Sequence, residues 1–257
     1  MGVVNVTPDS FSDGGRFLEA SAAVAHARRL VEDGADILDI GGESTRPGVA
    51  PVSEQEELDR VLPVLQELKD LDKPISVDTR RPGVMKAVLN AGAAMINDIQ
   101  ALGEAGAIEA VARSNCAVCL MHMQGQPAMM QHAPRYDDVV GEVMDFLRNR
   151  IAACEAAGIG RERIVADPGF GFGKTLAHNL TLLKNLAVFS ALQVPILAGW
   201  SRKSSLAAIT GRAVGERLAG SLAMALLGLQ GGATILRVHD VKETRDVIAV
   251  WQAVQQR

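Results

Sequence analysis

The sequence predicts a single-domain α/β protein in which eight parallel strands close into a (β/α)8 TIM barrel. Its 257 residues match the usual length of one such barrel, about 250 residues. Short apolar runs alternate with amphipathic stretches of helix length, which is typical of a parallel sheet covered by helices. One sequence pattern occurs three times, as DGADILDI, AGAAMIND and GGATILRV. In each case a helical stretch ends at a glycine and an alanine, and an apolar run follows directly. We expect one domain over residues 1–257.

Eight apolar runs are the expected strands. They span residues 3–6, 36–40, 74–77, 94–97, 117–121, 163–166, 194–198 and 233–237. Gly34, Gly92 and Gly232 precede three of these runs and suit the left-handed backbone position that follows a helix. The amphipathic stretch after Ser53 has Glu56 at capping-box spacing, which predicts the start of a helix. The repeating unit is therefore a helix, a glycine and a strand.

A doubly wound open sheet is the alternative fold. It requires a glycine fingerprint directly after the first strand, but the run at 3–6 is followed by TPDSFSDGG, which lacks that pattern. The run DPGFGFGKT resembles a phosphate-binding loop, yet Pro168 stands where that loop needs glycine. We therefore favour the barrel and expect no nucleotide binding through this run. Because the first strand starts near residue 3, we also expect either an open barrel floor or an N-terminal segment that this sequence does not include.

Composition and charge narrow the classes of function. A net charge of −4 disfavours a general binder of nucleic acid or anionic membrane, which rewards clustered basic residues. No apolar run approaches the ~20 residues that cross a bilayer, and no signal-like segment is evident. Three cysteines are too few for a disulfide framework, so a cytoplasmic protein is expected. Strand alternation should place Cys116 and Cys119 on opposite faces, which favours structural roles over a shared metal.

Each expected strand ends on polar residues. These are Asn5, Asp39, Asp78, Asn97, His122, Asp167, Ser201, Arg202, Lys203 and Ser204, and Arg237 with His239. A single such residue commonly caps a helix or forms a turn. A barrel, however, brings all of its strand ends to one mouth. Carboxylate and amide oxygens there would accept hydrogen bonds from a ligand rich in N–H groups, and the cationic side chains would hold an anion.

Eight motifs together resemble the dihydropteroate synthase family. They are MGVVNVTPDSFSDGG, DIGGESTRPG, SVDTRRPGV, INDIQAL, CLMHMQG, DPGFGFGKT, GWSRKS and RVHDVKET, which extend from Gly2 to about Thr244. The resemblance implies condensation of 6-hydroxymethyl-7,8-dihydropterin pyrophosphate with p-aminobenzoate, giving 7,8-dihydropteroate and pyrophosphate in folate biosynthesis. It also implies that sulfonamides, as p-aminobenzoate mimics, bind the enzyme.

The resemblance assigns roles to individual residues. The pterin would be held by Asp78, Asn97, Asp167 and Lys203, with Asp39 in the same polar network. Arg237 and His239 match pyrophosphate positions, and Asn5 matches a Mg²⁺ position. The p-aminobenzoate pocket would comprise Thr45, Arg46, Pro47, Phe172 and Ser204. Phe11 and Asp13 match catalytic loop positions, alongside Asp78, Asp167 and Lys203.

The implied mechanism is dissociative. The C–O bond breaks first and leaves a cationic pterin methylene, which the aryl amine then attacks. Carboxylates favour that cation, whereas two polar loops, at 7–16 and 41–52, would exclude water. The resemblance also implies a homodimer. Trp200 departs from the smaller residue expected before SRKS, and we expect it to alter packing behind Lys203 without touching the chemistry.

Two other functions fit part of the pattern. A pterin-binding methyltransferase would share the acidic pterin contacts and present methyltetrahydrofolate to a corrinoid partner, but it would not need SRKS, RVH or STRP. A pterin-binding paralogue without turnover would not need the loop residues. Pyrophosphate chemistry is therefore favoured. The sequence suggests no chemical role for His122.

Overall fold

The computed structural model describes residues 1–7, 16–44, 48–127 and 129–256. Its strands are β1 (Gly2–Asn5), β2 (Leu38–Gly41), β3 (Ile75–Asp78), β4 (Met95–Asp98), β5 (Ala117–Met121), β6 (Ile164–Asp167), β7 (Leu197–Ala198) and β8 (Ile235–Leu236). Every strand lies within or beside one of the apolar runs that predicted it. The boundaries differ by a few residues, chiefly because the last two strands are short.

The strands form a closed parallel barrel. β1 to β6 pair in sequence order, and β7 pairs with β8. Parallel bridges between Ala166 and Ile196 and between Gly2 and Val238 join the two sheets at both of their edges. At the second junction the Val3 amide donates to the Val238 carbonyl at 3.0 Å. The predicted barrel is therefore confirmed, and the open doubly wound sheet is excluded.

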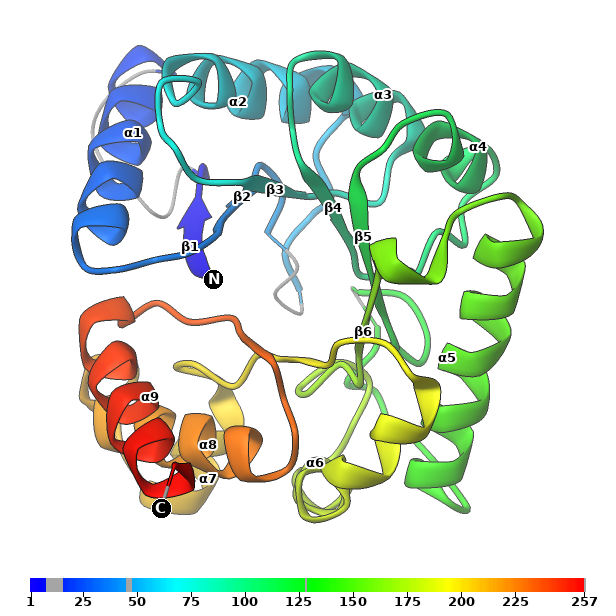
Figure 1. Cartoon of the computed structure of the whole chain (residues 1–257), viewed down its shortest axis with the longest axis vertical. Helices are drawn as coiled ribbons and strands as arrows, with labels where there is room; N and C mark the ends of the chain where they lie inside the picture. Colours follow the sequence, from blue (N-terminus) through cyan, green and yellow to red (C-terminus); the bar gives the residue numbers. More distant parts are fainter. Residues whose placement is uncertain (8–15, 45–47, 128, 257) are drawn as a thin grey trace.

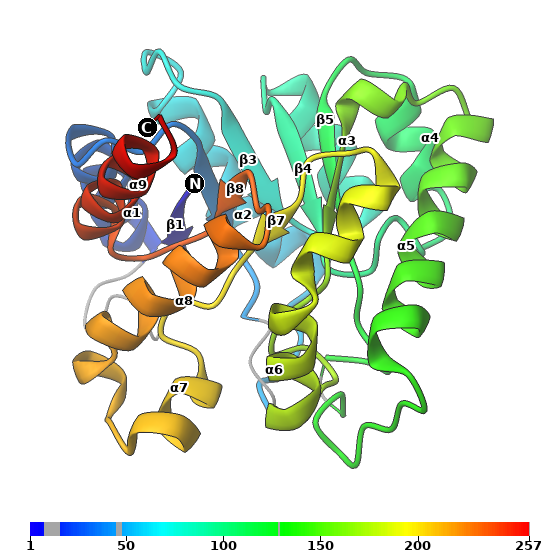
Figure 2. The same ribbon diagram turned by 60° about the horizontal axis from the view of Figure 1, so that its bottom comes forward.

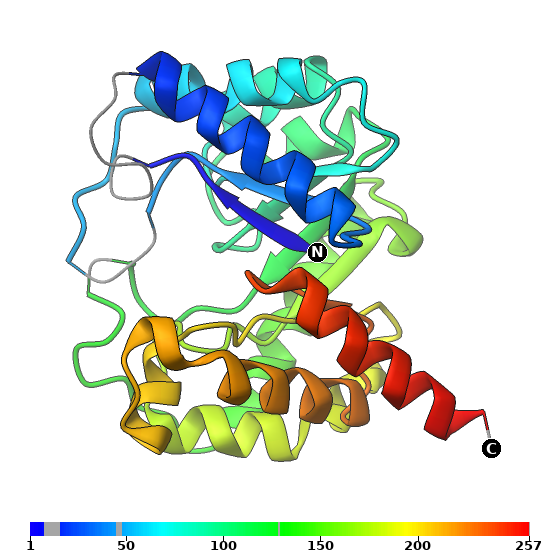
Figure 3. The ribbon, with the colours of Figure 1, turned by 90° about the vertical axis from the view of Figure 1, so that its left-hand side faces the viewer.

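Helices surround the barrel on its outside (Figure 1). They are α1 (Arg16–Glu32), α2 (Glu54–Glu67), α3 (Pro82–Asn90), α4 (Ala107–Ala112), α5 (Val139–Ala156), α6 (Leu176–Lys184), α7 (Ser204–Thr210), α8 (Leu218–Gln230) and α9 (Val241–Gln255). Short 3-10 helices lie at Arg161–Arg163, Leu186–Leu192 and Val214–Glu216. Figure 2 shows the helices around the strands from another side, and Figure 3 shows the N-terminus between α1 and α9.

Local backbone features agree with the sequence. The Ser53 hydroxyl accepts a hydrogen bond from the Glu56 amide at 3.1 Å and caps α2. Gly34, Gly92 and Gly232 have φ angles of 98°, 104° and 91°, in the left-handed region that favours glycine after a helix. None of the helices in the described ranges is long and apolar enough to span a membrane.

Alternation along the strands separates two apolar clusters. Outward residues such as Val118 join the main core between the strands and helices, and Cys116 belongs to that core. Inward residues Met95, Cys119, Val165 and Leu197 form a smaller cluster inside the barrel. The expected separation of the two cysteines is confirmed. Further along each strand the inward positions become polar, and these positions form the mouth.

Candidate active site at the carboxyl ends of the strands

Arg237, just after β8, lies at the centre of an ion-pair network. Its Nε donates to Asp39 Oδ2 at 2.6 Å, and its Nη2 donates to Asp78 Oδ2 at 2.9 Å. Asn97 donates through Nδ2 to the same Asp39 oxygen at 3.1 Å. Asp39 is fully buried, and its Oδ1 has no hydrogen-bond partner among the described residues. Strand register aligns Asp78 with Asn97, so the barrel brings together the side chains predicted on β2, β3, β4 and β8.

Burial has the largest effect on the pKa of the Asp78 carboxyl in this network. It raises the pKa of the Asp78 carboxyl to about 7, although Arg237 acts in the opposite direction. The Asp78 carboxylate is therefore poised to exchange a proton near neutral pH. Groups with strongly shifted pKa values in a concave mouth are typical of functional sites.

Asp167 and Lys203 form the opposite side of the mouth. Asp167 ends β6, and its Oδ1 accepts a hydrogen bond from the Gly169 amide at 2.7 Å. Burial raises the pKa of Asp167, and the positive charge of Lys203 opposes that rise. The Lys203 ammonium donates to the Phe170 carbonyl and lies 4.7 Å from the centre of the Phe172 ring. Burial lowers the Lys203 pKa to about 8.

Three glycines shape the loop between β6 and α6. Gly169, Gly171 and Gly173 have φ angles of 72°, 81° and 57°. A Cβ atom at Gly169 would lie 1.9 Å from the His122 carbonyl oxygen, and one at Gly173 would lie 2.5 Å from that of Gln124. Gly169 and Gly173 are thus explained by close packing of this loop against the segment after β5, whereas a Cβ atom at Gly171 would meet the Lys203 side chain.

Lys174 is a site residue that no sequence pattern indicated. Its side chain is only 3% exposed. Its Nζ lies 2.9 Å from His122 Nδ1 and 3.0 Å from the carbonyl oxygens of both Gly169 and Phe172. Burial lowers the pKa of Lys174 to about 7, and burial together with Lys174 lowers that of His122 to about 3. His122, which had no role in the sequence analysis, is therefore a neutral partner of Lys174.

His239 and Arg202 contact different groups. The Ser201 hydroxyl lies 3.0 Å from His239 Nδ1 and accepts from the His239 amide at 3.1 Å. Burial lowers the His239 pKa to about 4, which favours a neutral ring at physiological pH. Arg202, expected at an anion, instead pairs through Nε with Asp240 at 3.1 Å and is largely exposed.

The remaining predicted residues are distributed around the mouth. Asn5 ends β1 and pairs in register with Gly41, which in turn pairs with Asp78. Ser204 is the first residue of α7 and is exposed. Within the described ranges, no group of three or more His, Cys, Asp or Glu side chains could hold a metal ion. Phe11, Asp13, Thr45, Arg46 and Pro47 lie outside the described residues.

A second cluster that the sequence did not reveal holds both ends of the β2–α2 connection. Arg81 Nη2 donates to Glu43 Oε1 at 2.9 Å, and Glu43 Oε1 also accepts from the Val52 amide at 3.1 Å. Arg81 further contacts the Val52 carbonyl and the fully buried Glu57. One guanidinium therefore joins the residues on either side of positions 44–51.

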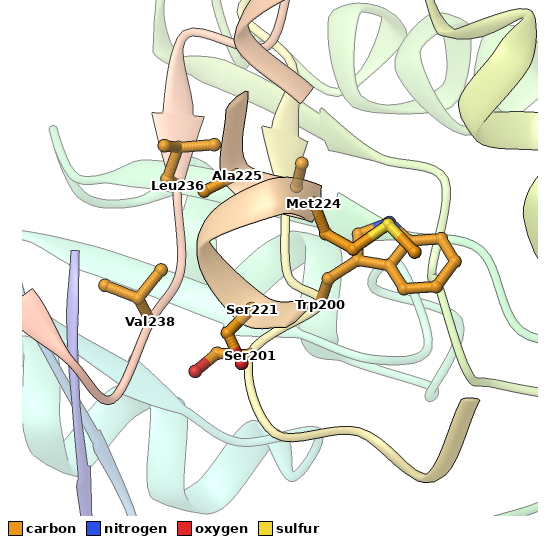
Figure 4. Close-up of a pocket in the computed structure, with 8 residues that line it drawn as sticks. Trp200, Ser201, Ser221, Met224, Ala225, Leu236 and Val238 are labelled. Carbon is orange, nitrogen blue, oxygen red and sulfur yellow. The ribbon is translucent and has the colours of Figure 1, made fainter. Parts of the chain in front are cut away.

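Trp200 packs behind the site. Its ring centre lies 4.9 Å from that of Phe170, whose carbonyl accepts from Lys203. Trp200 and Met224 line a small pocket beside β7, β8 and α8 (Figure 4). The indole Nε1 is buried without a hydrogen-bond partner in the part of the chain that the structure describes, so the ring acts there through its packing.

A closed parallel barrel with convergent polar side chains at its carboxyl end defines an enzyme of the barrel class. Residues 1–239 match the family described as pterin binding enzyme. Dihydropteroate synthase of Escherichia coli (strain K12) is 51% identical over 254 residues, which cover 98% of this chain and 90% of that protein. The chain belongs to the dihydropteroate synthase family of pterin-binding transferases.

Solved structures agree with this assignment. Dihydropteroate synthase of Yersinia pestis, in complex with a sulfonamide drug, has a TM-score of 0.95 and 49% identity, covering 100% of this chain and 94% of that one. The Xanthomonas albilineans enzyme, in complex with 7,8-dihydropteroate, has a TM-score of 0.91 and 53% identity, covering 99% and 92% of the two chains.

Proposed function

We propose that this chain condenses 6-hydroxymethyl-7,8-dihydropterin pyrophosphate with p-aminobenzoate to form 7,8-dihydropteroate and pyrophosphate. The observation that carries the proposal is the convergence of Asp78, Asn97, Asp167, Lys203 and Arg237 at one mouth. Supporting evidence comes from relatives about half identical to this chain, one of which is solved with the product 7,8-dihydropteroate.

The pterin would bind through complementary hydrogen bonds. Its amino and ring N–H groups suit the oxygens of Asp78, Asn97 and Asp167, and its carbonyl suits the Lys203 ammonium. Asp39 accepts from both Arg237 and Asn97 through its Oδ2. It would act by orienting those two side chains.

The leaving group would depart from the cationic side of the mouth. In a dissociative step the C–O bond breaks before the amine attacks, so positive charge develops on the pterin methylene and negative charge on pyrophosphate. The carboxylates of Asp78 and Asp167 would stabilise the first charge. Arg237 and His239 would stabilise the second, with His239 donating a neutral N–H because its pKa is lowered to about 4.

A Mg²⁺ ion at Asn5 is compatible with the donors at the mouth. Asn5 offers one amide oxygen at the end of β1, and the described residues contain no dedicated metal cluster. Mg²⁺ keeps several waters and is often bound by few protein oxygens together with substrate phosphates, which fits this donor set. When bound with the substrate it would neutralise pyrophosphate charge.

The p-aminobenzoate pocket would lie beside Phe172 and Ser204. The Phe172 ring already contacts the Lys203 ammonium, and Ser204 is exposed at the start of α7. Thr45, Arg46 and Pro47 would complete this pocket, and Phe11 and Asp13 would act from the first loop. A sulfonamide would occupy the same place, as the complex of the Yersinia relative suggests.

We also propose a cytoplasmic homodimer. The buried free cysteines suit a reducing compartment. Exposed apolar side chains on neighbouring helices, including Ile209, Leu218 and Leu227, offer surface for a second copy. A single species of monomer mass in analytical ultracentrifugation at micromolar concentration would contradict the dimer.

The direct test is turnover by the purified chain with Mg²⁺ and both substrates. We expect dihydropteroate to form and pyrophosphate to be released only when p-aminobenzoate is present. Pterin binding without such release would instead indicate the paralogue that binds without turnover. Methyl transfer from methyltetrahydrofolate to a corrinoid protein would indicate the methyltransferase.

A further inference from the structure

The Lys174 ammonium is buried among neutral acceptors. Its Nζ reaches His122 Nδ1 at 2.9 Å, the Gly169 and Phe172 carbonyls at 3.0 Å each, and the His122 carbonyl at 3.3 Å. No carboxylate hydrogen-bonds to it in the described part of the chain. A buried charge without a paired counter-ion is costly, so its presence requires an explanation beyond stability.

These contacts join two strand ends of the mouth. His122 follows β5, whereas Gly169 and Phe172 lie in the loop after β6. Between them lies Phe170, whose carbonyl accepts from Lys203. The Lys174 ammonium therefore fixes the loop on both sides of the carbonyl that holds Lys203, and it fixes the backbone of the ring against which Lys203 packs.

Lys174 also acts on the charge of Asp167. Burial raises the Asp167 pKa, and Lys203, the Gly169 amide and Lys174 each lower it. The charged groups that act on Lys174 itself are Asp167, which raises its pKa, and Lys203, which lowers it. His122 also faces it, but as a neutral ring. Asp167 thus has one lysine in the mouth and a second behind it.

We propose that Lys174 is a positioning residue for the synthase reaction, which holds Lys203 and Asp167 ready for the pterin through the loop between β6 and α6. The proposal rests on the proposed function, because it assigns the pterin contacts to those two side chains. Lys174 itself touches no substrate, since its ammonium is enclosed by His122 and the loop.

The same loop has anchors on its outer side. Gln131 Nε2 donates to the Gly171 carbonyl at 2.6 Å, and the Tyr136 hydroxyl donates to the Gly173 carbonyl at 2.8 Å. Asn179 Oδ1 accepts from the Gly171 amide at 2.7 Å. Loss of Lys174 should therefore displace the inner side of the loop without unfolding the protein.

The test is Lys174→Met, which keeps the unbranched chain up to about the Cε position and removes the ammonium group. Lys184→Met on exposed α6 surface is the matched control. We expect pterin affinity to fall about tenfold in Lys174→Met and to stay unchanged in the control. We also expect the Asp167 carboxyl, followed by ¹³C NMR and assigned with Asp167→Asn, to titrate at higher pH in Lys174→Met.

A second pair of variants covers the case in which Lys174→Met does not fold. His122→Asn keeps an acceptor near the position of Nδ1, whereas His122→Leu removes it. We expect weaker pterin binding in His122→Leu and near-wild-type binding in His122→Asn. Equal affinity in the two variants would overturn the proposal.

The outcomes distinguish a failure of the proposed synthase function from a failure of the role proposed for Lys174. An inactive wild-type chain would reject the synthase function itself. An active wild-type chain with unchanged pterin affinity in Lys174→Met would reject only the role of Lys174. Weaker affinity with an unchanged Asp167 titration would also reject it, because Lys174 would then be merely structural.

Discussion

Arg237 at the barrel mouth and Lys174 in the loop behind Asp167 are cations of one site, and they have different kinds of partner. Arg237 pairs with the carboxylates of Asp39 and Asp78 at 2.6 and 2.9 Å. Lys174 is bound by an imidazole and by carbonyl oxygens. Carboxylate pairing favours the charged form, whereas burial among neutral groups disfavours it. The Arg237 guanidinium therefore keeps a fixed charge, whereas the Lys174 ammonium is titratable.

This contrast has a consequence for stability and binding. Removal of Arg237 would leave two carboxylates without their counter-ion, whereas removal of a lysine on the other side would relieve a charge that burial disfavours. Neutral substitution should therefore destabilise the protein strongly on the Arg237 side and only slightly on the lysine side. Both sides should nevertheless lose pterin binding.

The largest expected effect on stability is that of Arg237→Met. We expect a loss of about 2–3 kcal/mol in the free energy of unfolding at pH 8, below the range for fully buried pairs because the Arg237 side chain is 23% exposed. The loss should shrink as the pH falls below 7, because Asp78 then takes up a proton. Denaturant unfolding at several pH values measures both effects.

The control for that prediction is Arg245→Met. Arg245 pairs with Asp36 at 3.2 Å, and both side chains are about half exposed or more. We expect a cost under about 1 kcal/mol. Equal losses in the two variants would show that the mouth carboxylates do not depend on Arg237.

A smaller effect on stability is expected for Lys203→Met. Lys203 has a carbonyl and an aromatic ring as its direct contacts, so we expect the free energy of unfolding to change by about 1 kcal/mol or less. Pterin affinity should fall about tenfold or more. Unfolding and calorimetric titration of the same preparation give the two values. A stability loss as large as that of Arg237→Met would remove the distinction between the two sides.

The fold and many site positions could be predicted from the sequence because barrel geometry converts strand ends into neighbours. To predict that Asp78 and Asn97 are neighbours, only the positions of two apolar runs were required, and the structure places the two residues in register. The pairing of Arg237 with Asp39 could not be predicted in that way. It joins residues 198 positions apart, and the direction of a long side chain is set by packing.

Lys174 was missed for a different reason. Its sequence context, GKT, resembles a phosphate-binding loop but follows Pro168 where that loop needs glycine. The role of Lys174 depends on the close approach of the loop to His122. A Cβ atom at Gly169 would lie 1.9 Å from the His122 carbonyl oxygen. A lysine shortly after three closely spaced glycines at a strand end was the available signal. His122 lacked a role for the same reason.

The central claim is that the charged mouth binds the pterin through ionised carboxylates. Calorimetric titration of the pterin pyrophosphate into wild type and Asp78→Asn tests it directly, with Asp36→Asn as the exposed control. Since burial raises the Asp78 pKa to about 7, wild-type affinity should weaken as the pH falls from 8 to 6. At pH 8, Asp78→Asn should bind about 100-fold more weakly than wild type. Equal affinity of Asp78→Asn and wild type at pH 8 would contradict the account.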